Sequence, residues 1–423
     1  MTTNSPSATT IELTVDGIAQ GGDGVGRHDG LVVFARGGLP GERVRLHLNE
    51  QKSSYARGEV VEVLSASPDR VAPAVADSSH APWQHIAYPA QLRLKETILR
   101  EQLAKLADVH DPPLAPIIAA PRPWGYRNTA RFHVHGHAIG YYASGTRDLV
   151  PVAADPLLLP ALNEALAALS SLLPPNLIEG VTLRASSAFG YSLALLHPSA
   201  GATYGDLELL ATAWRAHVPS LAGVSIETPN GLVRSAGAVK LHDALGDVIF
   251  SLGPASFFQV NVPQAAHLLA LVTKVLAPGP GVRLLDLYSG VGAFALPLAA
   301  AGAEVTAVEE YANAVADGER SAALNEIKGV RFLRAPVERI LPSIDGPFDG
   351  AVLDPPRRGC HPAVLEELAR LAPPRLIYIS CHPGILGRDL PPLLRSGYRL
   401  ESLQPIDMFP QTPHIETVVV LAR

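Results

Sequence analysis

The sequence has little cysteine, few aromatic residues and no long hydrophobic run. Only two of its 423 residues are cysteine, which excludes a disulfide framework. The most apolar window, residues 157–173, is interrupted by Pro160, Asn163 and Glu164, so it predicts an amphipathic helix and not a membrane span. The N-terminus, MTTNSPSATT, lacks the basic and apolar regions of an export signal. We therefore expect a cytoplasmic protein with no membrane partner.

An excess of positive charge is also absent. The chain has 34 Lys and Arg residues against 40 Asp and Glu residues, a formal net charge of −6. This balance excludes a surface that is basic all over and binds nucleic acid by charge alone, but it is compatible with a local basic face. Hydrophobic residues make up 47% of the chain, which is typical of a globular protein, and its length suits two or three domains.

Turn signals and proline-rich breaks divide the chain into three predicted domains. Residues 1–66 carry short alternating strands cut by glycine turns such as 21–24, which predicts a small closed or nearly closed β-barrel. This part holds slightly more acidic than basic residues, so an RNA-binding barrel and a module that only packs on its neighbour both stay open. Residues 67–253 predict a central α+β domain, and residues 254–423 predict a third domain.

The third predicted domain alternates strands and helices. Strands are expected near 284–288, 304–308, 330–333, 348–353 and 375–380, with helices near 293–301, 311–325, 361–372 and 383–395. Two adjacent strands, 398–406 and 415–422, follow. This order predicts an α/β fold with a doubly wound parallel sheet and an antiparallel edge pair. The ligand crevice of such a sheet lies at the carboxyl ends of its strands.

A glycine loop follows the first strand of this domain. The sequence DLYSGVG (286–292) breaks the strand, and the next strand ends on Glu309, about twenty residues after Gly290. In doubly wound folds a carboxylate at this place binds ribose hydroxyls, and the backbone of the loop approaches the ligand. The pattern predicts a nucleoside-bearing cofactor, and the alternative is a structural βαβ unit.

Three reactive groups fall at strand ends of the same sheet. Asp354 precedes two prolines, Cys381 precedes a helix, and Glu416 precedes the final strand. A helix N-terminus lowers the pKa of a thiol, so we expect Cys381 to be a reactive nucleophile. A buried cysteine without a chemical role is the alternative, which we assign to Cys360.

Residues 121–147 contain four arginines among five aromatic residues and no acid before residue 148. Arginine supplies phosphate contacts and aromatic rings supply stacking platforms for unpaired bases. The stretch therefore predicts RNA contact, and a strand pair with core aromatics is the alternative. The predicted RNA-binding residues are Arg122, Trp124, Tyr126, Arg127 and Arg131.

Five colinear motifs resemble the RNA 5-methyluridine methyltransferase family. They are FFQVN (257–261), DLYSGVG (286–292), DPPRRG (354–359), SCHPGILGRDL (380–390) and FPQTPHIET (409–417). The segments QHIAYPAQLRLK (84–95) and YRN (126–128) are also similar to that family, and residues 9–66 resemble its TRAM barrel. The resemblance implies a Rossmann-like domain that uses S-adenosylmethionine to methylate C5 of uridine in RNA.

The resemblance also implies roles for single residues. Cys381 would add to C6 of the uracil, and Glu416 would act as the base that removes the C5 proton. The target base would leave its stack to reach them. The cofactor would be bound by Gln259, Tyr288, Gly290, Glu309 and Asp354.

Two departures from the family pattern stand out. Many members hold an iron–sulfur cluster with four cysteines, three of them just before the QH segment and one further along the chain. Residues 74–85 and the region of Asp155 have no cysteine here, so we expect no cluster. Ala293 stands after the GVG, where several relatives have a polar residue, so one cofactor contact is expected to be missing.

The resemblance favours 23S ribosomal RNA over transfer RNA as the substrate, because many transfer-RNA members lack the barrel. A transfer-RNA uracil-C5 methyltransferase, a methyltransferase that acts on another nucleophile and a non-catalytic RNA-binding factor are the alternatives. We expect a monomer.

Overall fold

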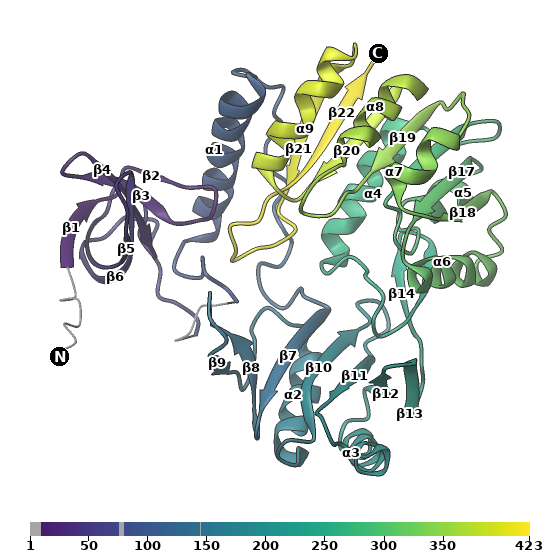
Figure 1. Cartoon of the computed structure of the whole chain (residues 1–423), viewed down its shortest axis with the longest axis horizontal. Coiled ribbons are helices and arrows are strands. Elements are labelled where there is room, and N and C mark those ends of the chain that lie inside the picture. The colour runs from purple at the N-terminus through teal and green to yellow at the C-terminus, as the bar shows by residue number, and fades with distance from the viewer. Residues whose placement is uncertain (1–9, 76–79, 144) are drawn as a thin grey trace.

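The computed structural model describes residues 10–75, 80–143 and 145–423, which form three large β-sheets and one separate hairpin. In Figure 1 the first sheet lies at the left, the second at the bottom and the third at the upper right. Residues 1–9, where we expect no export signal, and residues 76–79 of the segment without cysteine lie outside the described residues. Within the described ranges, no helix combines the length and the hydropathy that a bilayer span requires.

The first sheet curls into a nearly closed barrel, as the turn pattern predicts. Its strands follow the order β1-β5-β6-β4-β3-β2. The backbone N–H of Asp16 donates to Val25 O at 2.7 Å, which joins the end of β1 to β3. Gly26 is required at this contact, because a Cβ there would lie 2.1 Å from Thr14 O. The strands are β1 Thr10–Thr14, β2 Gly17–Ile18, β3 Gly24–His28, β4 Leu31–Arg36, β5 Arg43–Gln51 and β6 Tyr55–Ser65.

The second sheet is mixed and carries two helices on one face. Its order is β13-β12-β11-β10-β7-β8-β9. Apolar side chains of the strands and of α2 and α3 form one core around Phe132, Leu166 and Trp214. The elements are β7 Thr129–His135, β8 Ala138–Tyr142, β9 Leu149–Pro151, α2 Pro160–Leu172, β10 Ile178–Ala185, β11 Ser192–Pro198, α3 Tyr204–His217, β12 Leu221–Thr228 and β13 Gly231–Gly237.

The third sheet has the predicted parallel core and antiparallel edge pair, in the order β18-β17-β16-β19-β20-β22-β21. Its strands are β16 Arg283–Leu287, β17 Glu304–Glu309, β18 Val330–Arg334, β19 Gly350–Leu353, β20 Arg375–Ser380, β21 Arg399–Ile406 and β22 Glu416–Ala422. Its helices are α4 Val262–Leu276, α5 Ala295–Ala300, α6 Ala312–Leu324, α7 Val337–Ile340, α8 Pro362–Leu371 and α9 Pro383–Arg395. The sequence predicts neither α7 nor the 3-10 turn Leu341–Ser343 that follows it.

Two elements of the middle range pack on the third sheet. Helix α1 (Tyr88–Ala107) lies beside α9 and contributes Leu99 and Leu103 to the core on that side of the sheet. The hairpin of β14 (Leu241–Leu245) and β15 (Val248–Leu252) joins the core on the other side, with α4 and α6. The predicted domain boundaries, 1–66, 67–253 and 254–423, stay a prediction. By packing, α1 and this hairpin belong with the third sheet, although both fall in the predicted central domain.

Helix α1 holds the segment between β21 and β22 through a buried ion pair. Lys95 Nζ lies 2.5 Å from Asp407 Oδ1, and both side chains are fully buried. The same ammonium donates to Phe409 O at 3.1 Å, and the Tyr88 hydroxyl donates to Asp407 Oδ2 at 2.8 Å. Burial lowers the pKa of Lys95, and the Asp407 carboxylate opposes that effect. The segment that leads to Glu416 is therefore fixed to α1.

Replacing Lys95 should destabilise the protein strongly, because Lys95→Met leaves the Asp407 carboxylate buried without its cation. We expect a loss of about 3–5 kcal/mol in the free energy of unfolding, measured in urea at pH 7. The double variant Lys95→Met/Asp407→Asn should recover much of this loss, because it removes the unpaired charge. A single variant as stable as the wild type would contradict the role given to the pair.

Candidate active site at the carboxyl edge of the third sheet

Strand register brings the predicted cofactor residues to one level of the sheet. Leu287 of β16 pairs with Val308 of β17 on one side and with Leu353 of β19 on the other. The next residues along these strands are Tyr288, Glu309 and Asp354. Three residues that are far apart in the sequence therefore meet where their parallel strands end.

The antiparallel strand β22 brings Glu416 to the same edge. Ser380 of β20 pairs with Thr417 of β22, so continuing the register by one residue places Cys381 opposite Glu416. Directly opposed residues of antiparallel strands have Cβ atoms about 4.5–5.5 Å apart. This extended register, together with the effect of the Glu416 charge on the thiol, places the thiol and the carboxylate near each other at the ends of β20 and β22.

Burial raises the pKa of all three groups, and repulsion from neighbouring carboxylates adds to the shift at Cys381 and Glu416. Burial raises the pKa of Cys381 to about 11, and the carboxylates of Glu416 and Asp354 add to this shift. Burial and Asp354 also raise the pKa of Glu416 well above its usual range, and burial raises that of Asp354 to about 7. The predicted lowering of the Cys381 pKa is therefore wrong for the protein without ligands, because these effects outweigh that of the N-terminus of α9.

Arg357, from the loop after β19, supplies positive charge to this cluster. Its guanidinium opposes the rise in pKa of both Cys381 and Glu416. Its Nη2 lies 3.2 Å from Nε2 of His414. Burial and Arg357 lower the pKa of His414 to about 4, so that ring is neutral at pH 7 and accepts the hydrogen bond. Sequence reasoning missed Arg357, although it follows directly on the Asp-Pro-Pro motif.

The glycine loop fits a cofactor with a ribose and a positive charge. Glu309 accepts backbone hydrogen bonds from Gly290 and Tyr311, both at 2.9 Å. Gly290 has φ +56° and open space at its Cβ position, so a ligand can approach its backbone. Ser289 Oγ is buried and has no hydrogen-bond partner among the described residues. S-adenosylmethionine, which carries ribose hydroxyls, an ammonium and a sulfonium, suits this acceptor-rich loop.

Gln259 and Tyr288 lie near this loop in different environments. The Gln259 amide nitrogen is 3.4 Å from Asp354 Oδ2, so Gln259 belongs to the carboxylate cluster. Tyr288, at φ +62°, is half-buried, and its hydroxyl hydrogen-bonds to the Cys360 thiol. The side chain of Tyr288 therefore packs inward, and its backbone faces the glycine loop. Burial raises the pKa of Cys360 to about 12, in agreement with a structural role.

The predicted RNA-binding residues divide by exposure. Arg122 and Arg131 are exposed, while Trp124 and Arg127 are half-buried. Tyr126 is only 3% exposed, and its hydroxyl donates to Pro410 O at 3.0 Å. Its ring cannot stack on a base in this conformation, so the prediction of RNA contact is wrong for Tyr126. Tyr126 lies before β7, and its contact with the segment at Pro410 holds the ring inward, which residue type alone does not reveal.

The residues present do not fit an iron–sulfur cluster. Cys360 and Cys381 are the only cysteines of the chain, and they lie in the loops that follow β19 and β20. The two segments where the family carries cluster cysteines meet instead through His80 and Asp155, with His80 Nε2 3.5 Å from Asp155 Oδ1. Tyr141 completes the contact: its hydroxyl donates to Asp155 Oδ2 at 2.8 Å, and its ring lies 5.3 Å from the His80 ring.

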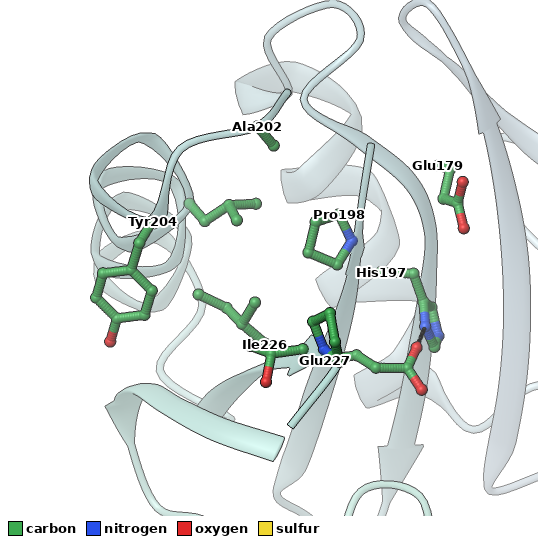
Figure 2. Close-up of a pocket in the computed structure, with 10 residues that line it drawn as sticks. Glu179, His197, Pro198, Ala202, Tyr204, Ile226 and Glu227 are labelled. Atoms are coloured by element: carbon green, nitrogen blue, oxygen red, sulfur yellow. Dashed lines mark hydrogen bonds and ion pairs between the residues drawn. The ribbon is translucent and has the colours of Figure 1, made fainter. Parts of the chain in front are cut away.

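A cavity of about 550 Å³ lies on the second sheet and not at the candidate active site. Figure 2 shows Glu179, His197 and Glu227 around it, with the imidazole of His197 joined to the carboxylate of Glu227. The cavity residues lie between 179 and 229, whereas the reactive groups lie beyond residue 353. We do not assign this cavity to the reaction.

Comparison with known proteins identifies two regions of the chain. Residues 8–61 match the TRAM domain model, and residues 244–349 and 345–423 match the model described as tRNA (Uracil-5-)-methyltransferase. An uncharacterized RNA methyltransferase of Thermosynechococcus vestitus is 38% identical, with 97% of this chain and 98% of the relative covered. The 23S rRNA uracil-C(5)-methyltransferase RlmD of Alkalilimnicola ehrlichii is 33% identical, with coverage of 98% and 96%.

The fold is also similar to a solved structure. The tRNA (uracil-54, C5)-methyltransferase of Pyrococcus abyssi, solved in complex with S-adenosyl-L-homocysteine, superposes with a TM-score of 0.76 at 22% identity. The match covers 97% of this chain and 100% of that chain. The arrangement of barrel, central domain and Rossmann-like domain is therefore shared over the whole length.

The raised pKa of Cys381 predicts a pH profile for its alkylation. In the free protein the rate with iodoacetamide should increase from pH 7 to about pH 11, because only the thiolate reacts. Glu416→Gln should move this profile to lower pH, because it removes a negative charge beside the sulfur. Peptide mapping separates Cys381 from Cys360, and Glu310→Gln, which changes an exposed acid elsewhere, is the control. A Glu416→Gln profile identical to that of the wild type would contradict the proximity of these groups.

Proposed function

Since the chain belongs to the tRNA (uracil-5-)-methyltransferase family, we propose that it methylates C5 of a uridine in 23S ribosomal RNA, with Cys381 as nucleophile and Glu416 as base. S-adenosylmethionine-dependent uracil-C5 methylation of RNA is the activity of this family. The observation that supports the residue assignment best is the position of Cys381 opposite Glu416 across β20 and β22. A covalent uracil methyltransferase needs a thiol and a base within reach of adjacent ring carbons.

Cys381 begins the reaction. Its sulfur, as the thiolate, adds to C6 of the uracil, and the electron pair of the C5–C6 double bond moves to make an enolate through C4 and O4. C5 then becomes a nucleophile, which it is not in the free base. Arg357 favours the thiolate by its positive charge, whereas Glu416 and Asp354 oppose it.

Glu416 completes the reaction. After C5 has gained the methyl group it carries both that group and its original proton. The Glu416 carboxylate takes this proton, the C5–C6 double bond forms again, and the C6–sulfur bond breaks to release the Cys381 thiolate. Glu416 Oε1 is buried and has no hydrogen-bond partner among the described residues, so it is available for this proton.

The loop around Gly290 would hold the cofactor, whose sulfonium supplies the methyl group. Glu309 would accept from the ribose hydroxyls, because its position at the end of β17 suits that contact. The backbone of Gly290 and Tyr288 would line the cofactor site. Gln259 and the buried Asp354 would face the positive part of the molecule, and a cation there would offset the repulsion among the carboxylates.

The RNA would lie across the three sheets. The barrel of residues 1–66 and the central domain of residues 67–253 would bind the strand, and residues 254–423 would carry out the chemistry. Arg122 and Arg131 are exposed and suit phosphate contacts, and Trp124 and Arg127 are partly accessible. The full-length similarity to a relative named for 23S rRNA supports ribosomal over transfer RNA. We expect a monomer that works in the cytoplasm, where its substrate is made.

A labelling assay tests this proposal. Purified protein with methyl-labelled S-adenosylmethionine should transfer label to unmodified 23S ribosomal RNA and not to transfer RNA, and the product should be 5-methyluridine. Cys381→Ala should abolish transfer, because Cys360, the other thiol of the chain, is buried against Tyr288. Cys360→Ala, which removes the buried structural cysteine, should keep transfer within about threefold.

Other outcomes of the assay have distinct meanings. Label only in transfer RNA would change the substrate, and label that survives Cys381→Ala would indicate a methyltransferase that uses another nucleophile. Binding of cofactor and RNA without any transfer would indicate a non-catalytic factor. Glu416→Gln should retain RNA covalently attached after methyl transfer, because the C5 proton cannot leave; its recovery on a denaturing gel would support the role as base.

Glu309 should contribute to cofactor affinity. Glu309→Gln keeps the shape of the side chain but removes the charge that strengthens hydrogen bonds to the ribose. We expect about tenfold weaker binding of S-adenosylhomocysteine by calorimetry. Glu310→Gln alters the exposed neighbouring acid and should leave affinity within twofold. Equal effects of the two variants would contradict a specific ribose contact.

A further inference from the structure

We propose that the β2–β3 turn of the barrel, residues 19–23, positions the nucleophile, and that Gln20 does so through His382. This inference rests on the proposed role of Cys381. The turn belongs to the first sheet, about 360 residues before the nucleophile in the sequence, yet it lies against both segments that carry the reactive groups. The barrel would therefore support the reaction besides binding RNA.

The first contact is between Gln20 and His382, the residue after Cys381. The amide nitrogen of Gln20 lies 2.9 Å from Nδ1 and 3.2 Å from Nε2 of the imidazole. A primary amide has both donor and acceptor groups, so it can hydrogen-bond to the imidazole ring that it faces. Burial and Arg357 lower the pKa of His382, so the ring is neutral at pH 7.

His382 in turn fixes the start of α9. It is the N-cap residue of the helix, and its Nδ1 accepts the backbone N–H of Ile385 at 3.1 Å. Its own backbone accepts from Ser380 Oγ at 3.2 Å, on the other side of Cys381. The Cys381 backbone is therefore held between two local hydrogen bonds, and Gln20 contacts the ring that makes one of them.

Close packing shows that the turn is seated on this helix end. A Cβ at Gly384, in the first turn of α9, would lie 2.8 Å from Oε1 of Gln20. Only glycine allows the amide to approach so closely without displacement. The side chain of Gln20 is half-buried by this contact, although it belongs to the barrel.

The second contact is with the segment that leads to Glu416. Gly22 has φ +92°, and a Cβ there would lie 2.7 Å from Cβ of Pro413 and 2.7 Å from Nε1 of Trp83. The Trp83 indole donates to Gly22 O at 3.1 Å, and its backbone N–H donates to Gln411 O at 3.0 Å. Trp83 thus ties the barrel turn and the 409–416 segment together.

A shared core makes this contact rigid. Trp83 is 1% exposed and packs in one apolar cluster with residues from the barrel, from α1 and from the segment just before β22. The cluster is Ile18, Leu39, Trp83, Ile86, Ala90, Ile98 and Ile415. Ile415 immediately precedes Glu416, so the turn is fixed against the base as well as against the nucleophile.

The turn also contacts Arg57 of β6. Arg57 Nη1 lies 3.5 Å from Asp23 Oδ2, and its guanidinium stacks 4.7 Å from the ring of Phe34. RNA phosphate bound by Arg57 would act on a side chain that touches this turn.

The test compares Gln20→Ala with Gln51→Ala, which removes an exposed glutamine of the same barrel at the end of β5. Gln20→Ala should slow single-turnover methyl transfer about fivefold, in keeping with the loss of one hydrogen bond. The KM for S-adenosylmethionine, the Kd for RNA and the melting temperature should stay unchanged. Gln51→Ala should match the wild type in every measurement.

A double-mutant cycle assigns the effect to His382. His382→Asn keeps an N-cap side chain but removes the ring that Gln20 contacts. In that background Gln20→Ala should have no further effect, because the two residues act through one contact. Three results would overturn the proposal. Gln20→Ala could leave the transfer rate unchanged, Gln51→Ala could slow transfer equally, or Gln20→Ala could slow transfer as much in the His382→Asn background as in the wild type.

A second readout separates this inference from the proposed function. Alkylation of Cys381 by iodoacetamide needs neither RNA nor S-adenosylmethionine. Gln20→Ala should accelerate it at least threefold at pH 8, because the amide no longer restrains the loop, while buried Cys360 stays unreactive. If the wild type transfers no methyl group but this acceleration occurs, the proposed function fails and the positioning contact stands. If the alkylation rates are equal, the positioning contact fails.

Discussion

The chemistry of this protein depends on one constraint of sheet geometry, namely that the carboxyl ends of parallel strands all lie at the same edge. Residues that follow β16, β17, β19 and β20 must therefore gather there. The last strand adds a group that a purely parallel sheet could not supply in this way. Because β22 is antiparallel to β20, its first residue, Glu416, lies at the edge where the other strands end. The thiol and the base meet because the last strand reverses.

The same geometry creates an electrostatic problem. Asp286, Asp354 and Glu416 are buried close together, and burial raises the pKa of each. The charge of Asp354 further raises the pKa of Glu416, and the charges of Glu416 and Asp354 raise the pKa of the Cys381 thiol. Arg357 offsets only part of this charge. The free site therefore holds protons that the reaction needs removed, and a cationic ligand among these carboxylates would favour their ionised forms.

Most of the third domain could be predicted from the sequence, because its apolar strands and amphipathic helices alternate regularly. The glycine loop before α5, Glu309 at the end of β17 and Cys381 after β20 follow from that order alone. The ionisation of Cys381 could not be predicted in this way. It depends on Asp354 and Glu416, which come from other strands, whereas the sequence shows only the local helix N-terminus.

Contacts between distant segments were also beyond prediction from the sequence. In the sequence, Lys95 is one polar residue of a predicted amphipathic helix. Asp407, with which it forms the buried ion pair, lies 312 positions further along the chain. The inward direction of Tyr126 depends on how the segment before β7 packs against the segment at Pro410. The barrel turn is a similar case, since nothing in the sequence around Gln20 and Gly22 indicates contact with His382 and Pro413.

The contact of His80 with Asp155 shows how one structural task can be met by different chemistry. The family resemblance places cluster cysteines in the segments of these two residues, where a shared metal centre would join them. Here Asp155 is fully buried and receives the Tyr141 hydroxyl and the backbone N–H of Leu157, and His80 packs on the Tyr141 ring. The close approach of His80 to Asp155 and the packing of the His80 and Tyr141 rings thus join the segment before α1 to the central sheet. This join contains no thiolate, so its integrity does not depend on iron supply or on the redox state of the cell.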